Sequence, residues 1–373
     1  MTALIAGSAV RTCFGDGAAT FAALTEGRSG VAPLKHHDPA HVGVAHGYEI
    51  NTERPAQFEA SEWLTVCVRE ALDQAGVDPA RQRCVALVGT GLRELSAVER
   101  MAAGGAPFGA GRLHFRAAVE RAAPGIAAVW TLAGACSAGG HALAMAQDLI
   151  ELGEAEAVVV GAADAMTASM LAMIGRAGDE PATEVRPFDV DRVGALLGDG
   201  AVALVLVPDE PGRPCLARLL SCGLSCDAWH QTAPDPAGTR RAMTDALERA
   251  GRVPADVDLV LAHGTGTLLN DVTEAQVLTE VFTGCQPGPL VTAIKGAVGH
   301  TSGGAALLNV AMAVQCLATG TVPPVAGLRD LLPEAAGLRL VRDAAVASAP
   351  RTVQTDAFGF GGVNAVSVIE AVP

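Results

Sequence analysis

The segment Leu259-Val-Leu-Ala-His-Gly-Thr-Gly-Thr267 joins an uninterrupted apolar run to a glycine-rich turn that carries a histidine. An apolar run without alternation is typical of a strand that is buried on both faces. The two glycines let the chain turn tightly where that strand ends. Open α/β proteins gather functional groups at the carboxyl ends of such strands. His263 is therefore a candidate functional residue, and Thr265 and Thr267 offer hydroxyl groups to a polar ligand.

The same combination of apolar runs and alanine-rich amphipathic stretches repeats along the chain, which is typical of α/β layers with largely parallel strands. The expected strands are Leu4–Ala9, Cys84–Val88, Ala157–Gly161, Ala201–Val207, Leu259–Ala262, Leu290–Ala293 and Val366–Ile369. The expected helices are Glu62–Ala75, Gly140–Leu152, Arg240–Ala250, Glu274–Phe282 and Gly303–Ala318. Turn-forming residues in Pro208-Asp-Glu-Pro-Gly-Arg-Pro214 predict an internal boundary, which gives halves of residues 1–207 and 208–373.

Composition and charge restrict the function classes. The 373 residues are 50% hydrophobic and 18% charged and include 43 glycines, which suits a tightly packed α/β enzyme. The net charge of -14 disfavours nucleic acid or an anionic membrane surface as the main partner, because both attract a basic face. No uninterrupted apolar run reaches the roughly 18 residues of a membrane span. The cysteines are odd in number and scattered, which argues against a disulfide framework and favours the reducing cytoplasm.

Cys136 lies in Gly134-Ala-Cys-Ser-Ala-Gly139, immediately before an expected helix. A helix N-terminus favours an anion, so we expect it to lower the pKa of the thiol, and its backbone amides can hold an oxyanion. The alternative is a small buried residue at a tight join between a strand and a helix. Ser137 does not fit the Gly-x-Ser-x-Gly spacing of serine hydrolases.

Two further segments carry candidate functional residues. Lys295 and His300 follow an expected strand, and Lys295 is one of two lysines among 26 basic residues. Lysine is not replaced by arginine where a site needs a compact ammonium group. A neutral imidazole donates a hydrogen bond to a carbonyl that gains negative charge. The segment Phe358-Gly-Phe-Gly-Gly362 can bring backbone amides and an aromatic ring close to a ligand.

The segments that contain Cys136, His263, Lys295 with His300, and Phe358–Gly362 resemble, in this order along the chain, the β-ketoacyl-acyl carrier protein synthases. These are the elongating, synthase II-like condensing enzymes of type II fatty acid and polyketide systems. The resemblance spans nearly the whole chain. It implies a thiolase-type fold, in which two similar βαβ-rich halves stack as five alternating αβαβα layers. It also implies a dimer, with each site near the interface.

The resemblance assigns a role to each candidate residue. Cys136 is expected to take an acyl chain from a carrier protein as a thioester. His263 and His300 are expected to hold the carbonyl of a malonyl thioester while carbon dioxide leaves, and Lys295 to position and polarise them. The backbone amides of Cys136 and Phe360 form the implied oxyanion hole. The positions implied for substrate binding and for the aromatic gate are Thr232, Thr265, Thr267, Phe358 and Phe360. No cofactor or metal is implied, because the substrates are carried on the phosphopantetheine of acyl carrier protein.

Several departures from the family pattern leave alternatives open. Asn309 stands nine residues after His300, where the family usually has an acidic residue that partners the lysine. Val363 and Leu268 replace a threonine and a proline, and the segment from about 90 to 130 is short. The alternatives are a chain-length-factor-like subunit of a heterodimer, which retained Cys136 disfavours, and an acyltransferase without decarboxylation, which the two histidines disfavour. A thiolase is disfavoured because no cysteine follows Cys316.

The expected partners are acyl carrier protein and a second subunit, either identical or homologous. Arginines that could dock the acidic carrier protein are Arg112, Arg116, Arg121 and Arg176, although the first three also suit a solvated helix face. A histidine cluster matches no standard zinc spacing and is expected to be a solvated loop; its members are His36, His37, His41 and His46, with Asp38.

Overall fold

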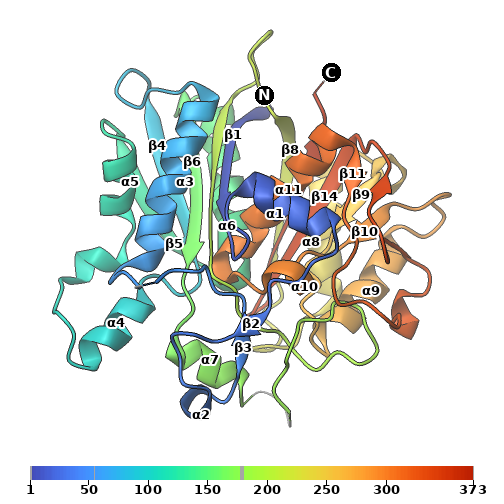
Figure 1. Cartoon of the computed structure of the whole chain (residues 1–373). Coiled ribbons are helices and arrows are strands. Elements are labelled where there is room, and N and C mark those ends of the chain that lie inside the picture. The colour runs from blue at the N-terminus through green and yellow to red at the C-terminus, as the bar shows by residue number, and fades with distance from the viewer. Residues whose placement is uncertain (1, 54, 177–179, 373) are drawn as a thin grey trace.

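The computed structural model describes residues 2–53, 55–176 and 180–372. Eleven strands form one mixed sheet in the order β12-β10-β9-β14-β15-β8-β1-β7-β6-β4-β5. Helices cover both faces of each half of this sheet (Figure 1).

The first half of the sheet is built from the N-terminal part of the chain. Its strands, in spatial order, are β5 (Ala128–Ala133), β4 (Cys84–Thr90), β6 (Ala157–Asp164), β7 (Gly200–Pro208) and β1 (Ala3–Arg11). Strand β4 is parallel to both β5 and β6, whereas β7 is antiparallel to both β6 and β1. Apart from β5, these strands are almost wholly buried.

The second half repeats this arrangement. Its strands are β10 (Leu290–Thr292), β9 (Leu259–Leu261), β14 (Thr352–Gly359), β15 (Val363–Glu370) and β8 (Ala217–Cys226), and β12 (Arg339–Leu340) extends the edge. Strand β9 is parallel to β10 and β14, and β15 is antiparallel to β14 and β8. The halves join where β1 pairs with β8 over Ala3–Ile5. The expectation of two similar halves is therefore confirmed at the level of topology.

Five alternating layers result. Helices α6 (Ala138–Glu151) and α11 (Ala305–Thr319) form the central layer, because α6 contacts β4 and β8 while α11 contacts β7 and β14. Helices α3 (Glu59–Ala75) and α5 (Arg116–Ala122) cover the first half from outside, and α8 (Pro236–Ala250) and α9 (Asn270–Val281) cover the second. The predicted αβαβα, thiolase-type architecture is confirmed.

The remaining elements are short and peripheral or lie at turns. The helices are α1 (Gly17–Thr25), α2 (Pro39–Val42), α4 (Leu95–Ala102), α7 (Ala168–Ile174) and α10 (Lys295–Val298). Short strands are β2 (Ala32–Pro33), β3 (His46–Gly47), β11 (Thr321–Val322) and β13 (Val346–Ala347). Single 3-10 turns are η1 (Ala110–Leu113), η2 (Ala135–Ser137), η3 (Pro254–Asp256), η4 (Ser302–Gly304) and η5 (Pro333–Ala335).

Helix α8 begins four residues before the predicted start because its N-terminus is capped locally. The Asp235 carboxylate accepts hydrogen bonds from the backbone amides of Ala237 and Gly238, and Pro236 occupies the first turn. These groups satisfy amides that the helix itself leaves free, and proline has the backbone angle that a first turn needs.

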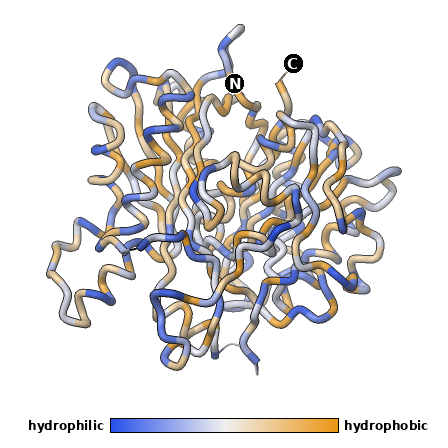
Figure 2. Tube along the Cα trace, in the orientation of Figure 1, coloured by the Kyte–Doolittle hydropathy of each residue, from blue (hydrophilic) through white to orange (hydrophobic). Residues whose placement is uncertain are grey.

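The window Ser302–Thr319 has the length and mean hydropathy, 1.3, of a membrane span, but 78% of it is buried inside the protein. It is the core helix α11 with the turn that precedes it. Hydrophobic residues lie along the strands and central helices, whereas hydrophilic residues gather in the peripheral loops (Figure 2). The apolarity of α11 is thus explained by its central position in the stack.

Candidate active site

Cys136 lies in the turn η2 between β5 and the central helix α6. The preceding Ala135 has φ 49°, a left-handed conformation that is uncommon for a residue with a side chain. The Ser137 hydroxyl donates a hydrogen bond of 2.8 Å to the Val363 carbonyl, at the start of β15. This bond fastens the cysteine turn to the second half of the molecule.

His263 and His300 come together at the end of β9 and after α10. Their ring centroids are 5.5 Å apart at an interplanar angle of 84°, and both side chains are buried. The backbone amide of Ser302 donates to His300 Nδ1 over 3.2 Å. A neutral imidazole that accepts at Nδ1 carries its proton at Nε2. His300 therefore presents an Nε2–H donor.

Lys295 fixes the other histidine in the same tautomer. Its Nζ donates to the backbone carbonyl of His263 and lies 3.3 Å from His263 Nδ1. An ammonium group has protons to donate and no lone pair, so Nδ1 accepts and Nε2 carries the proton. The predicted grouping of Lys295, His263 and His300 is present, with both imidazoles arranged as hydrogen-bond donors.

Burial and the charge of Lys295 keep both histidines neutral. Burial is the larger cause and Lys295 the second, and together they lower the pKa of His300 to about 3. The same two causes, with a smaller contribution from His300, lower the pKa of His263 well below its usual value. Neutral donors of this kind stabilise a developing oxyanion without a proton transfer.

The expectation of a lowered thiol pKa at Cys136 is wrong in its net direction. Burial raises the pKa of Cys136 above its usual value. The charge of Lys295 and a hydrogen bond from the Phe360 backbone amide act in the opposite direction, and the nearby Asp164 raises the value further. The resting residue is therefore a thiol, and Lys295 makes its ionisation easier.

Two carboxylates at the start of α9 hold the His-Gly-Thr-Gly-Thr turn. Glu274 accepts from the backbone amides of His263, at 2.6 Å, and Gly264, at 2.8 Å. Asp271 accepts from the amides of Thr265 and Gly266, both at 3.1 Å. These acids were missed from the sequence, although two acids three residues apart at a helix start, directly after a glycine-rich turn, are a usable signal.

Asp164 was missed as well. Its carboxylate accepts from the backbone amides of Gly91, Leu92 and Gly303, each at 2.8 Å, and from the Thr90 hydroxyl. The residue ends β6 in the first half, whereas Gly303 lies in η4 beside the histidines. Asp164 therefore joins the two halves directly beneath the candidate site.

The glycine-rich segment after β14 separates two phenylalanines. Phe358 is buried, with its ring centroid 5.6 Å from that of His263. Phe360 is 50% exposed, while its backbone amide reaches the Cys136 thiol. A buried ring beside His263 and an exposed ring on the residue whose amide reaches the thiol are compatible with the substrate-binding and gate positions that the resemblance implied.

The three candidate substrate-binding threonines lie in two different places. The hydroxyls of Thr265 and Thr267 lie 2.9 Å apart in the turn after His263. Thr232 is exposed, and its backbone amide donates to His230 Nδ1. It neighbours Gln231, whose carbonyl accepts from Gly361 in the loop of Phe360. The structure thus places Thr232 next to a residue that holds the loop of Phe360.

Asn309 makes hydrogen bonds to backbone and not to the lysine. Its amide Nδ2 lies 3.4 Å, 3.2 Å and 3.1 Å from the carbonyl oxygens of Leu261, Ala262 and Asp356. Two other residues differ from the family pattern. Leu268 is 59% exposed, and Val363 lies opposite Gly359 at the start of β15.

Three of the predicted arginines have intramolecular partners, and the fourth is exposed. Arg112 stacks over the ring of Phe58 at 4.1 Å, and Arg116 pairs with Glu120 at 3.1 Å. Arg121 pairs with Glu62 at 3.0 Å on the outer helix α3. Arg176 is exposed.

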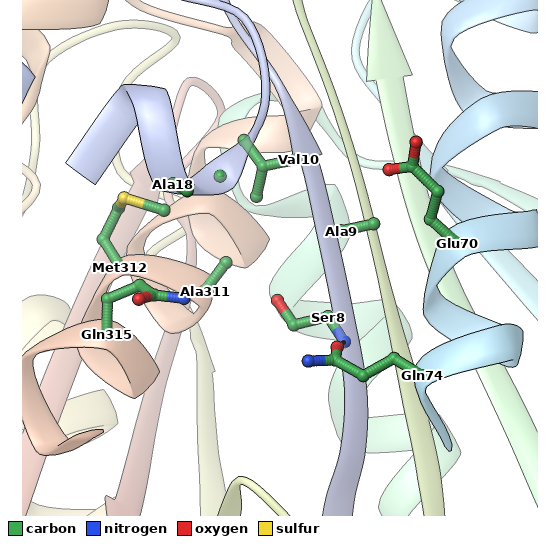
Figure 3. A pocket seen from close by; sticks show the side chains of 10 residues that line it. Ser8, Ala9, Val10, Ala18, Glu70, Gln74, Ala311, Met312 and Gln315 are labelled. Carbon is green, nitrogen blue, oxygen red and sulfur yellow. Dashed lines mark hydrogen bonds between the residues drawn. The ribbon is translucent and has the colours of Figure 1, made fainter. Parts of the chain in front are cut away.

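The described residues hold no group of three or more histidine, cysteine, aspartate or glutamate side chains arranged for a metal ion. Within the histidine cluster, the ring of His36 meets the backbone carbonyl of Thr52 at 3.2 Å. A separate cavity of about 340 Å³ lies between β1, α3 and α11 (Figure 3). Its polar lining includes Ser8, Glu70, Gln74 and Gln315, and none of the residues that line it belongs to the candidate site.

Comparison with known proteins shows to which proteins the chain is related. Family models described as beta-ketoacyl synthase match residues 3–211, for the N-terminal domain, and residues 216–329, for the C-terminal domain. Nodulation protein E of Rhizobium meliloti is 30% identical over 378 residues, which cover 94% of each chain. 3-Oxoacyl-(acyl-carrier-protein) synthase 2 of Mycobacterium tuberculosis is 34% identical over 252 residues. That match covers 64% of this chain and 60% of the mycobacterial one, less than two thirds of its length.

A solved structure described as the ishigamide ketosynthase/chain length factor has the same fold. It matches with a TM-score of 0.90 and 30% sequence identity, covering 100% of this chain and 99% of the other. The chain therefore belongs to the β-ketoacyl synthase family.

Proposed function

We propose that this protein is a cytoplasmic ketosynthase of a type II fatty acid or polyketide pathway. It catalyses the decarboxylative condensation of a cysteine-bound acyl chain with malonyl-acyl carrier protein, which gives 3-oxoacyl-carrier protein and carbon dioxide. The observation that carries the proposal is the convergence of the Cys136 turn with two neutral Nε2–H imidazoles from the other half. Turn η2, which carries Cys136, contacts η4, which begins two residues after His300, and this contact supports a shared site.

In the proposed first step, the acyl chain moves from carrier protein to enzyme. Cys136 Sγ forms a bond to the acyl carbonyl carbon, and the bond from that carbon to the carrier sulfur breaks. The proton of the Cys136 thiol ends on the carrier thiol. The backbone amides of Cys136 and Phe360 are the proposed donors to the oxyanion of the tetrahedral intermediate.

In the second step, malonyl-carrier protein loses carbon dioxide. The bond to its carboxylate breaks, and the electron pair moves into the thioester as an enolate. His263 and His300 donate hydrogen bonds to the enolate oxygen, which carries negative charge only as the reaction proceeds. The enolate carbon then attacks the acyl-Cys136 carbonyl, and the cysteine sulfur leaves and takes up a proton.

Intact mass spectrometry tests this proposal. The full chain, alone or with a homologous subunit, should gain one acyl group on Cys136 from acyl-carrier protein. It should lose that group when malonyl-carrier protein is added, with release of carbon dioxide. Failure of Cys136 to become acylated under either condition would contradict the proposal, and acylation without carbon dioxide release would favour an acyltransferase.

The rate of carbon dioxide release from malonyl-carrier protein should be nearly constant between about pH 5.5 and 7.5. An ordinary histidine has a pKa near 6.5, but burial and Lys295 lower the pKa of His300 to about 3. A lowered pKa means that the neutral form persists as the pH falls, so Nδ1 continues to accept and Nε2 to donate. Stopped-time assays across this range, with circular dichroism at each pH, check the result. A decline with a midpoint near 6.5 would contradict it.

We also propose that a second copy or a homologous subunit covers β5. This strand lies at the edge of the sheet, and the side chain of Trp130 on it is 44% exposed. An edge strand offers free backbone groups for pairing, and tryptophan is enriched in the centres of interfaces.

Replacing Trp130 by lysine should convert the assembly to monomers at micromolar concentration. The reason is that a charged side chain at the centre of such an interface loses its hydration on association. Light scattering after size-exclusion chromatography measures the mass. Trp229, which is 75% exposed, provides a control through Trp229→Lys. An unchanged mass for Trp130→Lys would refute this interface.

The remaining expectations follow from the same proposal. Acyl carrier protein is the proposed partner, as the name of the mycobacterial relative suggests. The proposed halves remain residues 1–207 and 208–373. The nine cysteines are free thiols, which supports the proposed cytoplasmic location.

A further inference from the structure

The turn that connects Lys295 to His300 depends on its surroundings for its shape. It consists of the single helical turn α10 followed by Gly299, which has φ 72°, and it contains a second glycine, Gly296. Glycine leaves the backbone free to adopt many conformations, and a four-residue helix leaves most of its carbonyl groups without partners inside the helix. Contacts from outside the turn must therefore set the positions of the ammonium group and the imidazole.

Three donors from the N-terminal part of the chain hold the carbonyl groups of this turn. The hydroxyl of Ser29 donates to the Gly296 carbonyl over 2.9 Å, and the hydroxyl of Tyr48 donates to the same oxygen over 3.2 Å. The backbone amide of Gly30 donates to the Ala297 carbonyl over 2.8 Å. Both lone pairs of the Gly296 oxygen are thus used, and the turn is fastened at two successive peptide groups.

The direction of the Tyr48 hydrogen bonds follows from their partners. The backbone amide of Val185 lies 3.1 Å from the Tyr48 hydroxyl oxygen and can only donate, whereas the Gly296 carbonyl can only accept. The hydroxyl proton therefore points toward Gly296. The side chain is fully buried, and burial raises the pKa of Tyr48 to about 12, so this donor is retained at neutral pH.

The ring of Tyr48 packs directly against the backbone next to His300. A Cβ atom at Gly299 would lie 2.4 Å from Cδ2 of this ring, so only glycine fits there. A Cβ atom at Gly296 would likewise lie 1.9 Å from the carbonyl oxygen of Ala326. The two glycines let the turn pack closely against its neighbours, and one of these neighbours is the tyrosine ring.

A short extended segment, residues 196–199, ties the backbone of Tyr48 to that of His300. Tyr48 exchanges two backbone hydrogen bonds with this segment, at 3.1 Å and 3.0 Å. His300 exchanges two others with the same segment, at 2.8 Å and 3.0 Å. The tyrosine and the histidine are therefore held by alternate backbone groups of one stretch of chain.

We propose that Tyr48 is a positioning residue that fixes the turn from Lys295 to His300. Its hydroxyl holds the Gly296 carbonyl, its ring supports Gly299, and its backbone shares a segment with the histidine. Removal of the hydroxyl should let the turn open, which changes the directions of the Lys295 ammonium and of His300 Nε2–H. The importance of these directions for decarboxylation rests on the proposed function, whereas the link between Tyr48 and the turn does not.

Hydrogen–deuterium exchange of the full chain tests this link without any substrate. Tyr48→Phe keeps the ring and removes only the hydroxyl. Exchange in the peptide that covers residues 295–304 should become about threefold to tenfold faster, the effect expected from the loss of one buried hydrogen bond. Ser29→Ala, which removes the other donor to the same carbonyl, should accelerate exchange of this peptide as well. The peptide that contains Cys136 should exchange as in the wild type.

Turnover gives the second readout. With malonyl-carrier protein, carbon dioxide release by Tyr48→Phe should fall by about 10- to 100-fold in kcat, because a displacement of roughly 1 Å at a site costs up to about 10²-fold. KM should change little. Acylation of Cys136 from acyl-carrier protein should be unchanged, since the hydroxyl of Ser137 fastens the cysteine turn to β15. A general loss of folded protein would instead lower both reactions together.

Ser221→Ala is the matched control. The Ser221 hydroxyl is buried and donates to the Ala246 carbonyl over 2.6 Å, between β8 and α8 and outside the candidate site. The variant should have a lower melting temperature, yet wild-type exchange in residues 295–304 and wild-type release of carbon dioxide.

Four results would overturn the proposal. They are unchanged exchange of residues 295–304 in Tyr48→Phe, faster exchange with carbon dioxide release at the wild-type rate, equal losses of acylation and carbon dioxide release, and the same changes in Ser221→Ala. If exchange rises as expected but the wild type releases no carbon dioxide with any carrier protein, the proposed function fails and this inference stands.

Discussion

Replacing Cys136 by alanine is expected to abolish acyl transfer from carrier protein and to lower condensation by more than about a thousandfold. In the proposed mechanism the thiol in η2, just before α6, forms the acyl-enzyme bond, and alanine offers no nucleophile. Decarboxylation of malonyl-carrier protein should persist, because the donor groups of His263 and His300 do not depend on the cysteine side chain. Intact mass measures the first effect and released carbon dioxide the second.

Cys285→Ala is the matched control for this variant. Cys285 is a half-buried free thiol near the surface, outside the candidate site. The Cys285→Ala protein should become acylated on Cys136 and catalyse condensation like the wild type. Acylation of the Cys136→Ala protein at the wild-type rate would refute the role of Cys136 and would place the nucleophile elsewhere.

His300→Ala is expected to separate the two half-reactions. Cys136 should still accept an acyl chain, whereas carbon dioxide release should fall by about 10²- to 10³-fold, the usual effect of removing one donor to an oxyanion. The loss should appear in kcat more than in KM, because the hydrogen bond becomes strong only as the enolate forms. Rapid-quench measurement of carbon dioxide from malonyl-carrier protein checks this result.

His114→Gln serves as the control, since His114 is an exposed histidine after η1. A second substitution, His300→Gln, keeps an amide donor and should recover part of the rate, which guards against a folding defect in the alanine variant. If His300→Ala releases carbon dioxide as fast as the wild type while retaining its fold, the oxyanion role of His300 is wrong.

Local patterns predicted the α/β class and the candidate functional residues, whereas the thiolase-type layers were predicted from the family resemblance. The strands that begin at Leu259 and Leu290 end in glycine-containing turns, and the structure places His263 and His300 together at those ends. Among the described strands of three or more residues, β5, β8 and β14 were missed. Strand β5 is at the edge and partly exposed, β8 mixes apolar with polar residues, and β14 carries buried Gln354 and Asp356. None of them gives the continuous apolar run of a buried strand.

The supporting acids were missed for two different reasons. Asp271 and Glu274 lie close in sequence to the turn that they hold, and their local signal was overlooked. Asp164 is an ordinary acidic residue in the sequence, and its importance comes from contacts between distant segments. Asp164 accepts from Gly303, 139 residues further along the chain. The raised pKa of Cys136 likewise comes from burial by both halves, which a helix N-terminus alone does not reveal.

Because the strand order repeats, the turn that carries Cys136 has a counterpart in the second half of the molecule. Turn η4 precedes α11 as η2 precedes α6, and the first residues of the two turns, Ser302 and Ala135, have nearly equal φ angles of 50° and 49°. The counterpart of Cys136 is therefore Gly303. A Cβ atom there would lie 2.5 Å from the carbonyl carbon of Thr90, so no side chain fits. The internal symmetry of the fold is thus broken at this position, where one half carries a thiol and the other has no room for a side chain.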